Sequence, residues 1–370
     1  MKWQGRTANR RGPRMLQGIA ASFFLAAAVS ASHIPSGPPR LLSETGLYAG
    51  NGTRTIDSAN RPFSPQYPLW SDGAAKSRWV RLPEDATIDA RLVDRWDFPA
   101  GTRFWKEFRF GDRKVETRYL RKNTDGSWTF ASYAWNEAQT DAILAPDAGL
   151  PNVAEIGPGR FHSIPAITDC RACHVPSEAA PGSGASRTEI LGFSALQLST
   201  DRDPGALHAE PLADGMVTLR TLHDERTLAP ARPERVTTPP RIQAPDARTR
   251  SVLGYLSTNC GSCHNQDSSI ANLGLRLKAP ATLSHAAPPR AVPPHLPISL
   301  FSTTSKWEIP HAPAGESRYV TPGTPDLSAI LVRMKSRRPS TQMPPLGTVL
   351  HDQEAIALVT EWIESLAPGT

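Results

Sequence analysis

Two short segments of this chain share one pattern, in which two cysteines separated by two residues are followed directly by a histidine. The first is residues 170–174 (CRACH) and the second is residues 260–264 (CGSCH). This spacing is typical of c-type haem attachment, in which each thiol adds to one vinyl group of the porphyrin. The adjoining histidine then donates a ring nitrogen to the iron as the proximal ligand.

Other chemistry is open to such thiol pairs. A lone CxxC also occurs in thioredoxin-like redox pairs and in half-sites for zinc, and four thiolates from both pairs could bind one zinc ion. Two complete copies, an export signal and a candidate distal methionine favour haem. We therefore predict two covalently attached haem c groups (iron), no catalytic residue, and haem-binding residues Cys170, Cys173, His174, Cys260, Cys263, His264 and Met343. Of these, the expected iron ligands are His174, His264 and Met343.

Residues 1–31 have the features of a signal peptide. A basic segment, residues 1–14, precedes an apolar run over residues 15–31, with small residues at the expected cleavage position. Arg10-Arg11 resembles a twin-arginine signal, but the following residues depart from that pattern. We expect a periplasmic protein, because c-type haem is attached outside the cytoplasm. Membrane association is expected only if the segment stays uncleaved as an anchor.

The net charge of +6 arises mainly in this leader, which holds five basic and no acidic residues. The other 36 basic residues (41 less five) nearly balance the 35 acidic ones, for a net charge of +1. The basic balance is thus a targeting feature. Since no basic stripe with interleaved aromatics is present either, we expect no nucleic-acid binding.

Residues 67–145 have the pattern of a small antiparallel sheet or sandwich. The strand candidates are residues 77–82, 102–110, 114–121 and 127–135, and turn residues separate the last three. Seven of the nine tryptophans precede residue 136. Such large side chains suit the core of a sheet, with a platform for a carbohydrate or another ligand as the alternative.

The surroundings of the second CxxCH motif are helical. A predicted helix over residues 248–258 runs directly into Cys260, a short one extends from 325 to 334, and the last covers 353–366 after the N-cap Asp352. Met343 lies between these last two, in a loop that two prolines stiffen, and is the expected distal ligand of the second haem. Met334 is the rival, but its helical position predicts a place in the core.

The first motif has a less regular setting. No amphipathic helix leads into Cys170, so we expect a loop-built site against the β-rich part. An open, five-coordinate iron is one possibility there. The alternative is a sixth ligand, for which the candidates are His162, His208, His223 and Met216.

These patterns predict an α+β fold, with a β-rich N-terminal domain, a loop-rich haem region and an all-α cytochrome c-like C-terminal domain. The expected boundaries are 1–31 for the signal peptide, 32–150 for the β-rich domain, 151–240 for the first haem-binding region and 246–370 for the cytochrome c-like domain with the second haem. The proline-rich connector 229–245 marks the last boundary.

At the level of whole motifs the chain resembles an uncharacterised bacterial dihaem c-type cytochrome family. The resemblance covers YLSTNCGSCHN, VTPGTPDLSAILVRM, QMPPLG and ALVTEWIESL near the C-terminus, and YPLWSDGAAKSRWVRLP and ITDCRACH upstream. It implies an exported haem protein with a β-rich N-terminal part and a role in electron transfer. It implies no substrate, and its site residues are the seven named above.

The expected function is electron transfer in the periplasm by an exported dihaem c-type cytochrome, with unidentified redox partner proteins. The alternative is a dihaem redox enzyme, peroxidase-like or oxidase-like, with an open coordination site at the first haem. The carrier is favoured because no recognisable acid or base lies beside the first motif. A third hypothesis is a binding protein whose β-rich domain docks a redox partner.

Overall fold

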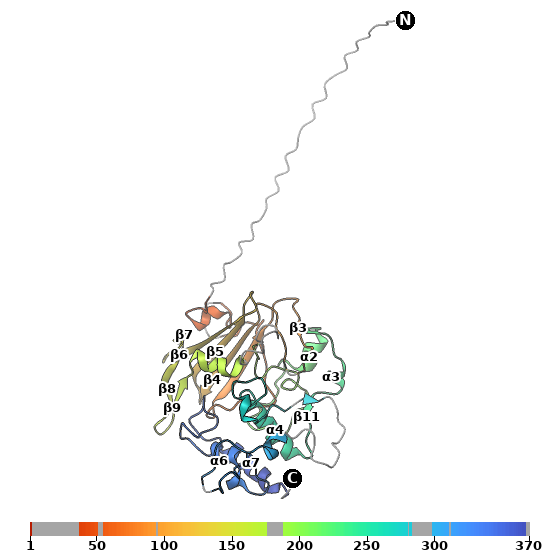
Figure 1. The fold of residues 1–370 in the computed structure, drawn as a ribbon. Coiled ribbons are helices and arrows are strands. Elements are labelled where there is room, and N and C mark those ends of the chain that lie inside the picture. Colours follow the sequence, from red (N-terminus) through yellow and green to blue (C-terminus); the bar gives the residue numbers. More distant parts are fainter. Residues whose placement is uncertain are drawn as a thin grey trace. The chain divides into compact units, whose positions relative to one another are not determined.

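A six-stranded antiparallel sheet organises the N-terminal half of the chain in the computed structural model (Figure 1). Its strand order is β1-β2-β4-β5-β6-β7. The central strands agree with the four predicted from the sequence to within two residues, so those predictions are confirmed. The bounds are β1 Arg61–Pro62, β2 Ala75–Arg81, β4 Arg103–Phe110, β5 Arg113–Lys122, β6 Trp128–Trp135 and β7 Ala142–Leu144.

The structure describes Met1 and residues 37–50, 55–93, 95–175, 188–279, 281–282, 298–310 and 312–367. The predicted signal peptide, apart from Met1, lies outside the described residues. Residues Gly37–Thr370 form one unit. Within the described ranges, no helix combines the length and the apolar character that crossing a membrane requires.

The two faces of the sheet differ, because successive side chains of a strand alternate between them. One face carries Trp105, Tyr119 and Tyr133, which are buried against residues of the 3-10 helix η1 (Leu42–Thr45). The opposite face, here called the cavity face, is apolar around Val80 and Phe104 and charged further along the strands. The tryptophans of the strands thus pack into cores, as the sequence predicts.

A hairpin that the sequence did not predict leads into the first motif. Strands β8 (Leu150–Gly157) and β9 (Arg160–Ile164) pair, and the short helix α1 (Ile167–His174) follows. The expected loop-built site is therefore wrong in its local structure, because CRACH itself is helical. The apolar residues of β8 and β9 are too sparse for clear alternation, which is why the pattern did not reveal the hairpin.

Short elements connect the sheet to the C-terminal part. Strand β3 (Ile88–Asp89) pairs in parallel with β10 (Leu228–Ala229), and β11 (Arg241–Ile242) pairs with β12 (Ala281–Thr282). The remaining elements are α2 (Leu219–Asp224), α3 (Glu234–Thr237), α4 (Ala247–Asn259), η2 (Ala271–Leu273), α5 (Ile298–Ser302), η3 (Pro325–Leu327), α6 (Ala329–Met334) and α7 (Gln353–Ser365).

The predicted fold class is wrong in its C-terminal part, where we expected an all-α cytochrome c-like domain. The predicted helices exist as α4, α6 and α7, and Asp352 caps α7 by accepting from Ala355 N at 3.1 Å. However, the structure is β-rich and its helices are short. The apolar faces of α4 and α7 share their core with Tyr67 and Leu196, which lie outside the predicted C-terminal domain. Helical periodicity predicts a buried face but not what packs against it.

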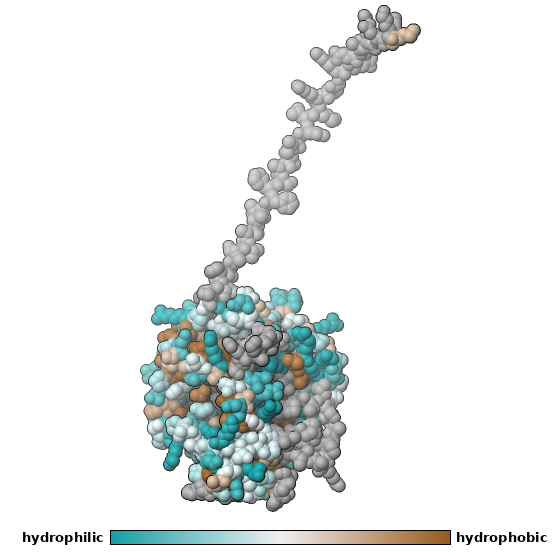
Figure 2. All heavy atoms as spheres, viewed as in Figure 1, coloured by the Kyte–Doolittle hydropathy of each residue, from teal (hydrophilic) through white to brown (hydrophobic). Residues whose placement is uncertain are grey.

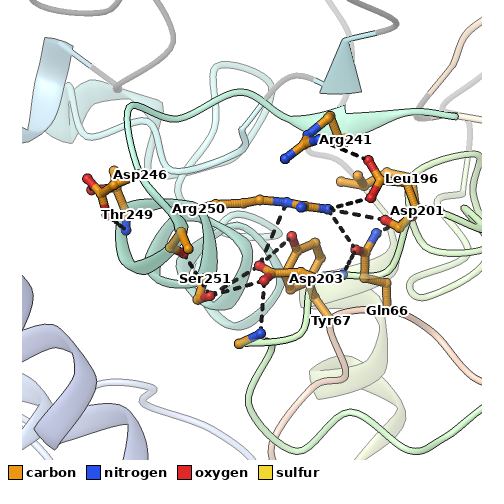
Figure 3. Close-up of polar contacts among 12 residues, drawn as sticks. Gln66, Tyr67, Leu196, Asp201, Asp203, Arg241, Asp246, Thr249, Arg250 and Ser251 are labelled. Carbon is orange, nitrogen blue, oxygen red and sulfur yellow. Dashed lines mark hydrogen bonds and ion pairs between the residues drawn. The ribbon is translucent and has the colours of Figure 1, made fainter. Parts of the chain in front are cut away.

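A buried polar network attaches α4 to the N-terminal half (Figure 3). The carboxylate of Asp203 accepts from Tyr67 Oη at 3.0 Å and from Ser251 Oγ at 3.2 Å. Arg250 donates to the backbone oxygen of Asp201 at 3.1 Å and contacts Gln66 at 3.4 Å. Since α4 ends directly before Cys260, this network sets the position of the second motif.

The outer surface is mostly polar on the face seen in Figure 2, with small apolar areas between charged side chains. Large apolar side chains that are exposed among residues 37–367 of the described chain are few and scattered. They are Leu92, Ile143, Phe161, Leu212, Leu327 and Leu346. Isolated apolar residues of this kind are normal for a protein surface.

Gly254 offers a test of the packing between α4 and the loop before β2. A β-carbon at Gly254 would lie 2.1 Å from Cε1 of Tyr67, whose ring is buried and whose hydroxyl is held by Asp203. We expect Gly254→Ala to lower the free energy of unfolding by about 1–3 kcal/mol, although alanine favours a helix. Urea unfolding measures this.

Gly157→Ala is the matched control, because its nearest neighbour would be Cβ of Arg160 at 3.9 Å. Equal stability of the two variants would contradict the close packing of Tyr67 on α4.

Candidate functional site

Both CxxCH segments open into one cavity of 680 Å³. Cavities of about 300–1,000 Å³ are typical of sites for small organic ligands and cofactors. The lining includes all seven residues predicted to bind haem, namely Cys170, Cys173, His174, Cys260, Cys263, His264 and Met343. The structure therefore brings together residues that are up to 173 positions apart, from Cys170 to Met343.

His174 is fixed by the backbone of Glu189. Its Nδ1 lies 2.7 Å from the carbonyl oxygen of Glu189, and Glu189 N donates to the His174 carbonyl at 2.8 Å. A carbonyl only accepts, so Nδ1 carries the hydrogen and Nε2 keeps a free lone pair. Burial lowers the pKa of His174 to about 4. The imidazole is thus neutral at pH 7 and suited to bind a metal through Nε2.

His264 is the last residue of the second motif, which begins directly after the C-terminal end of α4. Its backbone N donates to the Cys260 carbonyl at 2.8 Å, and its own carbonyl accepts from Leu277 N at 2.8 Å. The side chain is buried, Nδ1 has no hydrogen-bond partner in the described structure, and burial lowers the pKa to about 4. This imidazole is therefore also neutral at pH 7.

Gly261 has to be glycine for the second motif to fit. A β-carbon there would lie 2.4 Å from the Ser257 carbonyl oxygen and 3.1 Å from the backbone of Lys278. Residues 277–278 are also linked to both histidines. Leu277 donates to the His264 carbonyl, and the side chain of Lys278 forms an ion pair with Glu189, whose backbone holds His174.

The two motifs meet at their second cysteines. The thiols of Cys173 and Cys263 are hydrogen-bonded to each other, which raises the pKa of Cys173 and lowers that of Cys263. Two groups attached to these sulfurs would therefore have adjacent attachment points.

The loop with Met343 is held at both ends. Met343 N donates to the Arg333 carbonyl at 3.0 Å, and Arg333 Nε donates to the Thr341 carbonyl at 3.0 Å. Beyond the loop, the carboxylate of Asp72 accepts from Val349 N at 2.9 Å. Met343 is half-buried at the cavity, whereas its rival Met334 is buried in the core as expected, although it also lines the cavity.

The candidates for the sixth ligand of the first haem do not line the cavity. His162 bonds to Glu116 at 3.0 Å, His208 to Asp352 at 2.9 Å and His223 to Asp224 at 3.3 Å. Met216 is half-buried elsewhere. Among the described lining residues, the imidazoles are those of His174 and His264, and the thioethers are those of Met334 and Met343.

Several residues around the cavity were missed from the sequence. Arg118 lines it, and Arg78 and Lys106 line a smaller adjoining cavity of 150 Å³ that also contacts His174. Alternation along a strand predicts which face of the sheet each of these residues lies on. Only the register between strands shows that Arg78, Lys106 and Arg118 lie next to one another. Nothing in the sequence indicated a role for Glu189, because it holds His174 through its backbone carbonyl and amide and not through a recognisable side-chain motif.

Glu116 is a buried carboxylate beside Arg118. It is 0% exposed, and it accepts from Arg118 Nε at 2.7 Å and from His162 Nε2 at 3.0 Å. Burial raises the pKa of Glu116, but Arg118 and His162 outweigh this effect and lower it to about 2. The ionised carboxylate therefore fixes Arg118 at the wall of the cavity.

No direct metal-ion site accompanies the cavity in the described ranges, where no three His, Cys, Asp or Glu side chains gather in a suitable group. Haem supplies four nitrogen ligands of its own, so a haem site does not require such a group. No family model, curated protein or solved structure matches the chain. What the site does has to be inferred from its residues.

The contact between Cys173 and Cys263 predicts the disulfide that the haem-free protein forms. Mild oxidation of the full chain without haem should link Cys173 to Cys263, because these two thiols interact with each other. Peptide mapping by mass spectrometry without reduction identifies the bond. Cys170→Ser should leave this bond intact and Cys173→Ser should abolish it, whereas a dominant bond within each CxxC would show that the motifs do not meet.

Glu116 predicts a specific pH dependence of stability. Its pKa is about 2 in the folded chain against 4.5 for a free glutamate, so its contribution is complete above pH 4.5 and disappears as the pH falls toward 2. We expect Glu116→Gln to lower the free energy of unfolding at pH 7 by about 3 kcal/mol and to flatten the pH dependence below 4.5. Urea unfolding at several pH values measures both effects.

The exposed Glu137 provides the control, as Glu137→Gln removes a carboxylate without a buried ion pair. The prediction fails if both variants lose stability equally with falling pH.

Proposed function

We propose that this chain is an exported dihaem c-type cytochrome that transfers electrons in the periplasm. In this proposal one haem c is bound by Cys170, Cys173 and His174, and the other by Cys260, Cys263 and His264. The observation that carries it is the meeting of both CxxCH motifs at one cavity, with Cys173 against Cys263. Two groups attached there would lie next to each other.

The residues fit such a cofactor chemically. Both histidines are held neutral by burial, as iron ligation requires, and Nδ1 of His174 is engaged by a carbonyl, which orients Nε2. Nδ1 of His264 is a buried polar atom without a partner in the described residues. Apolar side chains such as Leu275 and Ile330 line the cavity and suit a macrocycle.

When bound, haem supplies a one-electron couple between ferric and ferrous iron. The chain's own residues hold the couple in place and set its surroundings. Met343 offers a soft thioether, which favours the reduced metal and raises the potential of a site that it binds. The bond from Met343 N to Arg333 keeps this sulfur at the cavity.

The pairing of the two sites supports a carrier. Electron transfer between centres requires proximity and little rearrangement. The ion pair between Lys278 and Glu189 and the bond from Leu277 to His264 join the supports of both proximal histidines into one framework. An electron that entered at one site could therefore leave from the other without a conformational change.

A second candidate function is a redox enzyme with an open position at the first haem. The observation in its favour is that His162, His208, His223 and Met216 do not line the cavity, so none of these predicted ligands is in place. Visible and electron paramagnetic resonance spectra of the oxidised, haem-loaded protein separate the two candidate functions.

The test is the visible and electron paramagnetic resonance spectra of the oxidised, haem-loaded protein. We expect two haems per chain by mass, and low-spin signals with the near-infrared band of a methionine–iron bond. Met343→Leu should abolish this band, while the matched variant Met334→Leu should keep it, because Met334 belongs to the core.

A chain that carries no covalent haem after export would contradict the proposal. A high-spin signal that changes on addition of cyanide or peroxide would favour the enzyme over the carrier. Persistence of the methionine–iron band in Met343→Leu would show that another residue is the distal ligand.

A further inference from the structure

Three cations lie side by side across the cavity face of the sheet. The register pairs Arg78 of β2 with Lys106 of β4, and Lys106 with Arg118 of β5. Side chains at directly opposed positions lie within contact range, and like charges there destabilise a sheet. We call these three residues the cation row.

Neighbouring carboxylates do not fully neutralise the cation row. Arg78 bonds to Glu210 at 2.9 Å, and Arg118 bonds to Glu116 at 2.7 Å. Within the described part of the chain no carboxylate or hydrogen-bond acceptor contacts Lys106, whose amine lies 4.9 Å from the Phe108 ring centroid. Two carboxylates therefore face three basic side chains. Burial, with the charges of Arg78 and Arg118, lowers the pKa of Lys106 well below its usual value, because no anion among the described residues contacts the charged amine.

Buried hydrogen-bonding capacity is also unused along the cation row. The side chain of Arg78 is 5% exposed, yet its Nη2 has no hydrogen-bond partner in the described structure. The same holds for the buried hydroxyl of Ser132, which lies opposite Arg118 in the next strand. Buried donors without partners are costly, so such a cluster indicates that something else binds there.

The cation row reaches the surroundings of His174. Arg78, Lys106 and Arg118 line the cavity of 150 Å³, and His174 and Glu189 line it too. The cation row thus faces the place where the first haem would bind.

We propose that the cation row is a carboxylate-binding site, occupied in the mature protein by a propionate of the haem attached at Cys170 and Cys173. A carboxylate would accept hydrogen bonds from Arg78 Nη2 and Lys106 Nζ and supply the missing negative charge. A haem held by Cys170, Cys173 and His174 would bring two propionates into this part of the chain, because His174 lines the same small cavity as the cation row. This inference rests on the proposed function, and a small free carboxylate is the other source of the same chemistry.

Lys106→Met is the informative variant, because it removes the cation without an acceptor and leaves no new group unpaired. In the haem-free full chain it should raise the melting temperature, since it relieves repulsion from Arg78 and Arg118. In the haem-loaded protein it should lower the reduction potential of one haem and leave the other unchanged, because a nearby cation favours ferrous iron. Arg113→Met, which removes an exposed cation from β5, should change neither quantity.

Added acetate distinguishes the two sources of the carboxylate. At constant ionic strength, acetate but not chloride should raise the melting temperature of the haem-free wild-type chain, and Lys106→Met should lose this effect. The haem-loaded wild type should not respond, because the propionate already fills the site. A response of the loaded wild type that Lys106→Met abolishes would overturn the propionate assignment in favour of a free carboxylate.

Two other outcomes complete the test. If acetate leaves the haem-free wild type unchanged and Lys106→Met leaves both potentials unchanged, the cation row binds no carboxylate and the inference is overturned. If the exported chain attaches no haem, the proposed function and the propionate assignment both fail. Acetate binding to the haem-free chain then still decides whether the cation row is a carboxylate site.

Discussion

The buried carboxylate of Asp203 is the interaction on which the arrangement of this chain depends. It accepts hydrogen bonds from Tyr67 in the N-terminal half and from Ser251 on α4, with Arg250 at 3.9 Å. Because α4 leads directly into Cys260, these bonds place the second motif against segments that precede the first. Gly254 lets Tyr67 pack directly on the helix backbone. A buried network of this kind tolerates little displacement, since any lost partner leaves a desolvated polar group.

The cavity is a consequence of this docking. The sheet and α1 supply one wall, and the segments around Cys260 and Met343 supply the other. The segment 277–278 then connects the two walls, through the bond from Leu277 to His264 and the ion pair from Lys278 to Glu189. Burial keeps His174 and His264 neutral at pH 7, and backbone hydrogen bonds attach each of them to this framework.

Electrostatics divides the cavity into unlike regions. Near the second motif, apolar side chains such as Leu275 and Ile330 line the cavity together with Arg333, whose charge adds to the effect of burial in lowering the pKa of His264. Near the first motif, Arg78, Lys106 and Arg118 concentrate positive charge, which Glu116 and Glu210 offset only in part. Positive charge beside a redox iron favours its reduced form, and its effect depends on which anions are bound nearby. The two sites would then differ in potential even though their attachment motifs are alike, and the cation row is where that difference would originate.

The sequence by itself determined the features that depend on neighbouring residues. The spacing of Cys260, Cys263 and His264 predicts haem chemistry, and alternation predicted the central strands. Helical periodicity predicted α4 and α7, and Asp352 was the predicted N-cap of α7. The tertiary structure decided what depends on residues far apart in the chain. Pairing of β4 with β5 brought Lys106 opposite Arg118, the backbone of Glu189 came to His174, and α4 and α7 packed with Tyr67 instead of forming an all-α domain. Local patterns cannot encode these contacts, because register and packing partners are set by the whole core.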